Sequence, residues 1–277
     1  MAREPAVAGQ FYPGDASELE SMIERFTPAD ADRSPALGAL SPHAGYVFCG
    51  GVMGRLFGGI EIPRRVLLLN PSHQVGRPGV ALWTGESWQT PLGEVELDEE
   101  LNRELSDLPM VTEDNRPHVG EHSGEVVLPF LQYHQPRLQV AVACVTGAAD
   151  LDDLLALGDA VAELSDERDD LLVVASSDMS HESGPNALDV VKKQDPKAIE
   201  KMEHLDPEGL LKVCRSENIT MCGVLPAVAM IQSAKARGAD EGTLVEQATS
   251  ADSPYGSAGY VVGYAGMRFD RAAATGG

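Results

Sequence analysis

The sequence predicts an α/β protein built on a mostly parallel sheet. Short apolar runs alternate with helical patterns along most of the chain, which is the order expected when strands and helices take turns. Three runs are almost uninterrupted by polar residues, as strands covered on both faces are. They are Val66–Leu69, Leu138–Val145 and Leu171–Ala175. Alternation and continuous hydrophobicity together favour a sheet covered on both faces.

Weaker strand patterns near the two ends of the chain extend the expected sheet. One runs from Ala36 to Leu40 and the other from Tyr260 to Met267. The segment Gly79–Leu97, which holds both tryptophans, is typical of an antiparallel excursion around a turn at Gly85.

The clearest helix follows Asp150. This aspartate can cap the helix, Asp152 and Asp153 complement its dipole, and apolar residues at helical spacing up to Leu164 line one face. Pro226 is tolerated because it falls in the first turn of its helix. The further expected helices are Leu97–Leu105, Val126–Tyr133, Pro207–Val213 and Val224–Ala236.

Composition and charge restrict the partners. The chain has 277 residues, with 43 acidic and 21 basic side chains and a formal charge of -22. Such a field repels phosphate, so nucleic acids and anionic membranes are poor candidate partners. The chain has no CxxC pair, no signal-peptide core and no apolar run that could cross a membrane, which favours a cytoplasmic protein with reduced thiols. We expect one domain over residues 1–277, with a disordered tail from about 271 to 277.

Polar clusters follow the expected strands, and this is where open α/β sheets bind ligands. Singly, each histidine is explained by a structural hydrogen bond, and only the recurrence of the pattern favours imidazoles that converge for metal binding or proton transfer. Three clusters follow strands, namely Ser41–Tyr46 with His43, Pro71–Gln74 with His73, and Ser176–His181 with Asp178. A fourth, Gly120–Glu125 with Glu121 and His122, directly precedes the helix expected from Val126.

Cys222 lies just before the helix expected from Val224. The positive end of the helix dipole favours the thiolate there, although a buried cap residue explains this position equally well. A thiol hydrolase that uses Cys222 and Asp178 is disfavoured, because the sequence contains neither a Gly-x-Ser-x-Gly elbow nor a cysteine-hydrolase signature. The glycines of Gly50–Gly54 match no phosphate-binding loop, and we expect them to let a helix pack closely on the sheet.

Taken together, nine motifs resemble the Memo family, whose bacterial and archaeal members are called AmmeMemoRadiSam system protein B. Their order along nearly the whole chain makes the resemblance specific. The motifs are Val7–Pro13, Pro42–Tyr46, Pro71–His73, Thr90–Gly93, Glu121–Ser123, Ser176–His181, His204–Pro207, Met221–Gly223 and Val261–Ala265.

The resemblance implies a single three-layer α/β/α domain, similar to class III extradiol dioxygenases, which are non-haem iron(II) enzymes. Those enzymes hold iron with two histidines and a carboxylate. The Memo set has a cysteine instead of the carboxylate, and on this sequence it corresponds to His43, His73 and Cys222. His181 matches the acid/base histidine. The other implied pocket residues are Asp178, Glu121 and His122.

The cysteine changes the expected metal chemistry. A thiolate is softer than a carboxylate, so iron or copper is expected, and zinc also fits. A thiolate is itself oxidisable, so ring cleavage does not follow from the fold. Two departures from the family pattern, Phe48–Gly50 after the first histidine motif and Glu182 after the last, put details of substrate contact in doubt.

Three functions remain open at this point. The first is a metal-dependent redox or dioxygenase-like enzyme with an unidentified substrate. The second is a non-enzymatic adaptor that uses the same pocket for a peptide or small ligand, although the charge of -22 argues against an anionic peptide. The third is a functional link to a radical-SAM protein, which the bacterial family name suggests; the chain itself has no CxxxCxxC cluster motif.

Overall fold

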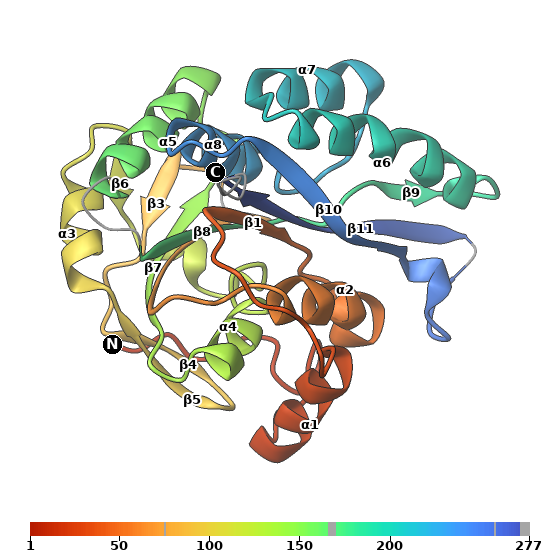
Figure 1. Ribbon diagram of the computed structural model, residues 1–277, viewed down its shortest axis with the longest axis horizontal. Coiled ribbons are helices and arrows are strands. Elements are labelled where there is room, and N and C mark those ends of the chain that lie inside the picture. Colours follow the sequence, from red (N-terminus) through yellow and green to blue (C-terminus); the bar gives the residue numbers. More distant parts are fainter. Residues whose placement is uncertain (75, 166–169, 258, 272–277) are drawn as a thin grey trace, which may run out of the picture.

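The computed structural model describes the chain except residues 75, 166–169, 258 and 272–277. Its centre is one sheet of eleven strands (Figure 1). The strands are β1 (Gly38–Ser41), β2 (Arg65–Pro71), β3 (Val80–Leu82), β4 (Ser87–Thr90), β5 (Gly93–Leu97), β6 (Val111–Glu113), β7 (Gln139–Val145), β8 (Leu171–Ser176), β9 (His181–Ser183), β10 (Glu241–Thr249) and β11 (Tyr260–Asp270). The expected tail lies outside the described residues from 272 onward.

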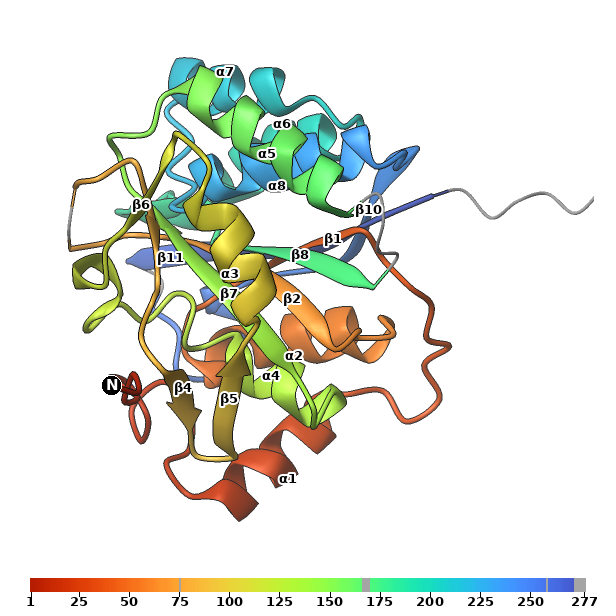
Figure 2. The same cartoon turned by 90° about the vertical axis from the view of Figure 1, so that its left-hand side faces the viewer.

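The helices form a layer on each face of this sheet, which gives the three-layer architecture (Figure 2). On one face lie α1 (Ala16–Phe26), α2 (Tyr46–Gly58) and α4 (Leu128–His134). On the other lie α3 (Glu99–Ser106), α5 (Leu151–Ser165), α6 (Ala187–Glu203), α7 (Pro207–Glu217) and α8 (Val224–Ala236). The two short 3-10 helices are Arg116–His118 and Ser250–Asp252.

The sheet is parallel at its centre and antiparallel toward its edges. The strands β1, β8, β2 and β7 are adjacent and parallel, as the apolar runs predict. At one side β11 and β10 are added antiparallel, and at the other side β3 runs antiparallel to β7. The prediction of an α/β fold with a parallel central sheet is therefore confirmed, with antiparallel additions at both sides.

Burial on both faces explains why the central runs lack polar residues. Along β2, Val66 and Leu68 pack into the core under α1, α2 and α4, while Leu67 and Leu69 pack under the opposite helices. All four side chains are at most 1% exposed. Because successive strand residues point to opposite faces, a strand between two helical layers needs apolar residues at every position.

The antiparallel excursion forms, but the predicted position of its turn is wrong. The hairpin pairs β4 with β5, and its turn lies between Thr90 and Gly93, not at Gly85. Gly93 has φ +118°, a conformation that glycine adopts readily, so it can close this tight turn. Gly85 serves packing instead, because a Cβ there would lie 2.3 Å from the Trp83 ring.

The glycines of Gly50–Gly54 do lie in a helix, but they pack against another helix and not on the sheet. A Cβ on Gly54 would lie 2.3 Å from the backbone oxygen of Phe26, at the end of α1. A Cβ on Gly50 would meet the ring of the same phenylalanine at 2.3 Å. The two glycines therefore let α1 and α2 approach closely.

A buried histidine makes stability depend on pH. His118 is fully buried, and its Nε2 lies 3.0 Å from the backbone oxygen of Ala81. Burial lowers the pKa of His118 from 6.5 to about 4. Between these values the unfolded chain binds the proton and the folded chain does not, so stability is complete above pH 6.5 and declines as the pH falls toward 4.

We expect wild type to lose about 3 kcal/mol of unfolding free energy through this group as the pH falls from about 6.5 to about 4. Urea unfolding at several pH values measures the loss. In His118→Gln, which keeps a hydrogen-bond donor, this part of the loss should disappear. An equal decline in His118→Gln and wild type would contradict the assignment, and His204→Gln, at an exposed position, is the control.

Among the described residues, no helix combines the length and apolarity that a membrane crossing requires.

Candidate metal site

The candidate site lies where three neighbouring parallel strands end. His43 follows β1 and His73 follows β2, each two residues after its strand, while β8 between them continues into Asp178. Cys222 is contributed by another segment, the turn that precedes α8. Since parallel strands end at the same edge of a sheet, the topology brings these distant segments together.

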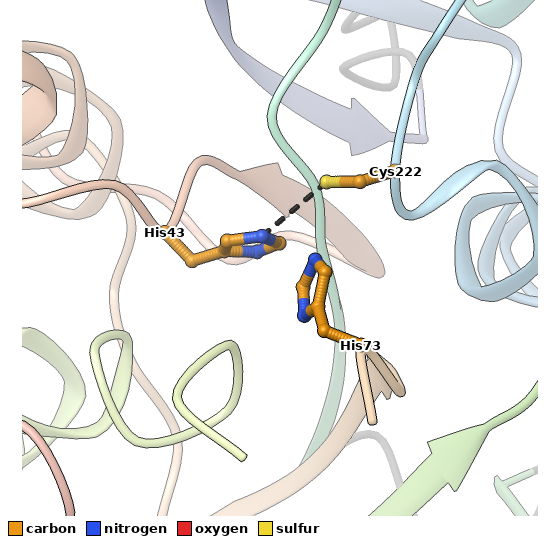
Figure 3. A group of neighbouring side chains, drawn as sticks. All are labelled: His43, His73 and Cys222. Carbon is orange, nitrogen blue, oxygen red and sulfur yellow. Dashed lines mark hydrogen bonds between the residues drawn. The ribbon is translucent and has the colours of Figure 1, made fainter. Parts of the chain in front are cut away.

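Two histidines and one cysteine converge here, as Figure 3 shows. One donor atom from each of His43, His73 and Cys222 lies within 4.8 Å of the other two. The Sγ of Cys222 is 3.3 Å from Nε2 of His43. The ring centres of the two histidines are 5.4 Å apart. These are the three residues that the Memo resemblance implies as ligands.

His43 is held from its backbone and from its ring. Asp178 Oδ1 accepts the backbone N–H of His43 at 2.8 Å, and Nδ1 of the ring lies 2.6 Å from the Ser176 hydroxyl. Burial, followed by the charges of the neighbouring histidines, places the pKa of His43 well below its ordinary value. The imidazole is therefore neutral at pH 7, which is the form that coordinates a metal.

His73 is oriented by Glu121. A carboxylate oxygen lies 2.8 Å from Nδ1 of His73, and the backbone N–H of the same histidine donates to the other oxygen at 2.7 Å. Although burial opposes ionisation, these bonds hold the pKa of Glu121 at about 2. The hydrogen bond that His73 donates to Glu121 raises the pKa of His73. The Nε2 atom of His73 stays available for a metal.

A second group of donors overlaps the first. His73, Glu121 and His122 also bring three donor atoms within 4.8 Å of one another. Glu121, however, already accepts the hydrogen bonds from His73 and one from the Ser123 backbone at 3.0 Å. A metal here would have to displace these bonds, so the set with Cys222 fits an ion better.

The remaining predicted residues surround the same place. His122 lies between Phe11 and His73, with ring centres 5.0 and 4.8 Å away. Burial raises the pKa of Asp178 to about 6. His181 stands farther out, with Nδ1 3.0 Å from the Met179 backbone oxygen, and its charge acts on both His43 and Asp178. The structure thus places all seven predicted site residues in one neighbourhood at this edge of the sheet.

Of the two interpretations left open for Cys222, the structure favours a buried neutral thiol in the metal-free protein. Burial, followed by the negative charge of Asp178, raises the pKa of Cys222 far above its ordinary value. The helix begins at Val224 and Gly223 is its N-cap, so the dipole acts on the sulfur but is outweighed. A bound cation would remove the thiol proton.

A large cavity lies at the opposite end of the sheet. Its volume is about 1070 Å³, and it includes Arg65 and Gln139, the first residues of β2 and β7. Because β2 has seven residues, this cavity is roughly 20 Å from the strand end beside His73. Eight of its lining residues are acidic, but none of them belongs to a donor group found among the described residues.

Gly223 allows Cys222 to approach β8. A Cβ at this position would lie 2.2 Å from the backbone oxygen of Ser176. We expect Gly223→Ala to lower the unfolding free energy by about 1–3 kcal/mol and to move the thiol away from His43. Urea unfolding and the rate of thiol alkylation measure the two effects.

Gly51→Ala is the matched control for Gly223→Ala. A Cβ on Gly51 meets nothing within 4 Å, and its position inside α2 predicts a gain of about 0.5–1 kcal/mol. If Gly223→Ala were as stable as Gly51→Ala, the close approach to β8 would be unimportant.

Comparison with known proteins decides the family. The model of the family described as Memo-like protein matches residues 3–268. The chain belongs to the Memo family. A MEMO1 family protein of Aquifex aeolicus is 40% identical over 275 residues, which cover 96% of this chain and 98% of the relative. A MEMO1 family protein of Methanopyrus kandleri is 38% identical and covers 98% of this chain and 100% of the relative.

This Memo protein also has a distant structural similarity to a protein of known structure. An uncharacterised protein of Escherichia coli K12 matches with a TM-score of 0.47 and 14% identity, covering 83% of this chain and 98% of that one. A likeness this weak says nothing about activity. The similarity to extradiol dioxygenases therefore stays a prediction from the sequence.

Sequence reasoning missed three residues that hold the site of this Memo protein. Ser176 and Ser123 lie inside the family motifs, but a serine near a histidine does not by itself indicate a role in a site. Phe11 lies in the motif Val7–Pro13, and its ring contacts His122 edge-on. Only the fold shows that this N-terminal segment reaches the pocket.

Proposed function

We propose that this Memo-family protein binds one iron or copper ion through His43, His73 and Cys222 and uses it in redox chemistry on a small substrate. The observation that carries the proposal is the convergence of three donor atoms, from three separate loops, within 4.8 Å. Convergence of that kind gives a mixed nitrogen and sulfur donor set, which suits a transition-metal ion.

The residues present fit such an ion. His43 is neutral, and His73 donates an orienting hydrogen bond to a carboxylate, as metal-binding histidines commonly do. One thiolate with two imidazoles suits copper or iron, and zinc would bind without redox activity. When bound, the ion would supply a change of oxidation state and positions open to a substrate.

Side chains beside the ligands suit proton handling. His181 has Nδ1 directed at two backbone oxygens, those of Met179 and Thr220, so its Nε2 can accept a proton. Asp178, whose pKa is about 6, can hold a proton close to Cys222. We propose His181 as the acid/base residue, and His122 as a wall of the substrate pocket.

A binding function without turnover is the alternative, and exposed apolar residues near the pocket favour it. Tyr260 is 49% exposed, and partial burial, followed by the nearby charge of Asp178, raises its pKa. Val47 and Tyr255, also exposed, are joined through Ser253, which bonds to the backbone of each. An adaptor would use this rim for a peptide or small ligand.

Metal analysis after anaerobic purification tests the proposal. Wild type and His204→Ala, which changes an exposed histidine, should each carry close to one iron or copper ion per chain, and the double variant His43→Ala/His73→Ala should carry almost none. Equal, negligible metal in all three proteins would remove the basis of the redox function. Calorimetry with peptides and phenols, with and without metal, separates the adaptor from the enzyme.

A further inference from the structure

We infer that Ser176 is a positioning residue that fixes the tautomer of His43, within one buried hydrogen-bond network that also fixes His73. The inference rests on the proposed function in one respect: a metal needs the lone pair of Nε2. The network itself is a property of the protein without metal. Its members are Ser176, Ser123, Glu121 and the two histidines.

The proton of the Ser176 hydroxyl decides the tautomer of His43. Oγ of Ser176 lies 2.7 Å from the backbone oxygen of Ser123 and 2.6 Å from Nδ1 of His43. A carbonyl oxygen only accepts, so the single hydroxyl proton must go to Ser123 for both contacts to be attractive. The hydroxyl then accepts from His43, which requires a proton on Nδ1.

The tautomer leaves the lone pair of His43 on Nε2. This atom is the one that faces Cys222, at 3.3 Å from Sγ. Both Ser176 and His43 are at most 1% exposed, so water does not compete for these contacts. The other tautomer would direct an N–H at the place where a metal must sit, and it would leave two acceptors, the serine hydroxyl and the ring nitrogen, facing each other.

The same arrangement recurs at His73 and shares Ser123. The backbone N–H of Ser123 donates to Glu121 at 3.0 Å, and the Ser123 hydroxyl lies 2.8 Å from the same carboxylate oxygen. That oxygen is 2.8 Å from Nδ1 of His73. An ionised carboxylate only accepts, so His73 also carries its proton on Nδ1. Ser123 therefore joins the two histidines through its carbonyl on one side and its amide on the other.

The network predicts preorganised ligands. Both imidazoles present Nε2 lone pairs before any metal arrives, so binding requires no ring flip and no tautomer exchange. Ser176 contacts Nδ1 of His43, whereas Nε2 is the atom that faces Cys222, so Ser176 acts through His43. The consequence is a measurable state of the metal-free protein.

Two-dimensional ¹H–¹⁵N NMR of the histidine rings tests the inference. In metal-free wild type at about pH 8, where imidazoles are neutral, His43 should show the tautomer with its proton on Nδ1. In Ser176→Ala the population should shift strongly toward the Nε2–H tautomer. Ser233→Ala is the control, because Ser233 is a fully buried serine in α8 that lies outside this network.

Two results would overturn the inference. One is an Nε2–H tautomer of His43 in wild type, which needs no variant and therefore does not depend on whether Ser176→Ala folds. The other is an unchanged Nδ1–H tautomer in a folded Ser176→Ala protein. Copper affinity gives the linked readout, with a loss of about 10- to 100-fold in Ser176→Ala and little change in Ser233→Ala. If no variant binds metal but the tautomer still shifts, the redox proposal fails and the positioning role stands.

Discussion

Cys222→Ala is expected to bind copper(I) at least about 100-fold more weakly than wild type. Removing a residue that only orients a ligand lowers metal affinity about 10- to 100-fold, and removing the ligand itself should lower it more. Competition with a chromogenic chelator under anaerobic conditions measures the affinity. Cys214→Ala is the control, since Cys214 is buried in α7 and belongs to the apolar core. Equal copper affinity in wild type and Cys222→Ala would show that the sulfur is not a ligand.

Cys222→Asp refines this expectation. An aspartate would convert the donor set to two histidines and one carboxylate, which is harder than the set with a thiolate. We expect the preference to move from copper(I) toward iron(II) or manganese(II), with less copper bound than in wild type. Preference for copper(I) that is unchanged by the aspartate would contradict the role assigned to the sulfur.

Arg3→Ala is expected to lower the unfolding free energy by about 3–5 kcal/mol, since it breaks a buried ion pair. The guanidinium lies 2.6 Å from a carboxylate oxygen of Glu125, and both side chains are at most 3% exposed. The arginine also donates to the backbone oxygens of His118 and Glu121 and stacks on the Trp88 ring at 4.3 Å. Its loss therefore leaves a buried carboxylate without its cation.

Arg55→Ala is the matched control for Arg3→Ala in urea unfolding. Arg55 pairs with Glu246 at 2.7 Å, but its side chain is 59% exposed. An exposed pair contributes less than about 1 kcal/mol. Equal losses in the two variants would show that the N-terminal ion pair is no more important than a surface pair. Because Arg3 also holds the backbone of Glu121, weaker metal binding should accompany the lost stability.

The sequence predicted the central strands because burial on both faces leaves a clear apolar signature. It also indicated the ligand-bearing loops, since His43 and His73 directly follow such strands. It did not predict α1, α6 or β10, and it put the hairpin turn at Gly85. A glycine signals a turn and a close packing contact equally, and only the position of the Trp83 ring distinguishes the two.

Residues that support the site were harder to predict than the ligands. Arg3 lies in a short segment with no helical or strand period, so nothing in the sequence links it to Glu125, 122 positions away. Ser176 is adjacent to another serine, and the direction of its hydroxyl depends on the positions of β8 and the Ser123 turn. The family motifs contain Ser176 and Ser123 without indicating what either one contacts.

The ligands of the candidate site come from distant parts of the chain. His43 and Cys222 are separated by 179 positions, and the helices and strands between them must assemble before the two atoms can approach. In a chain still emerging from the ribosome, His43 and His73 are present long before the cysteine is made. A metal would therefore bind after folding and not guide it, and it would stabilise the finished protein by mass action. Occupied sites would then be found only in chains that have completed their fold.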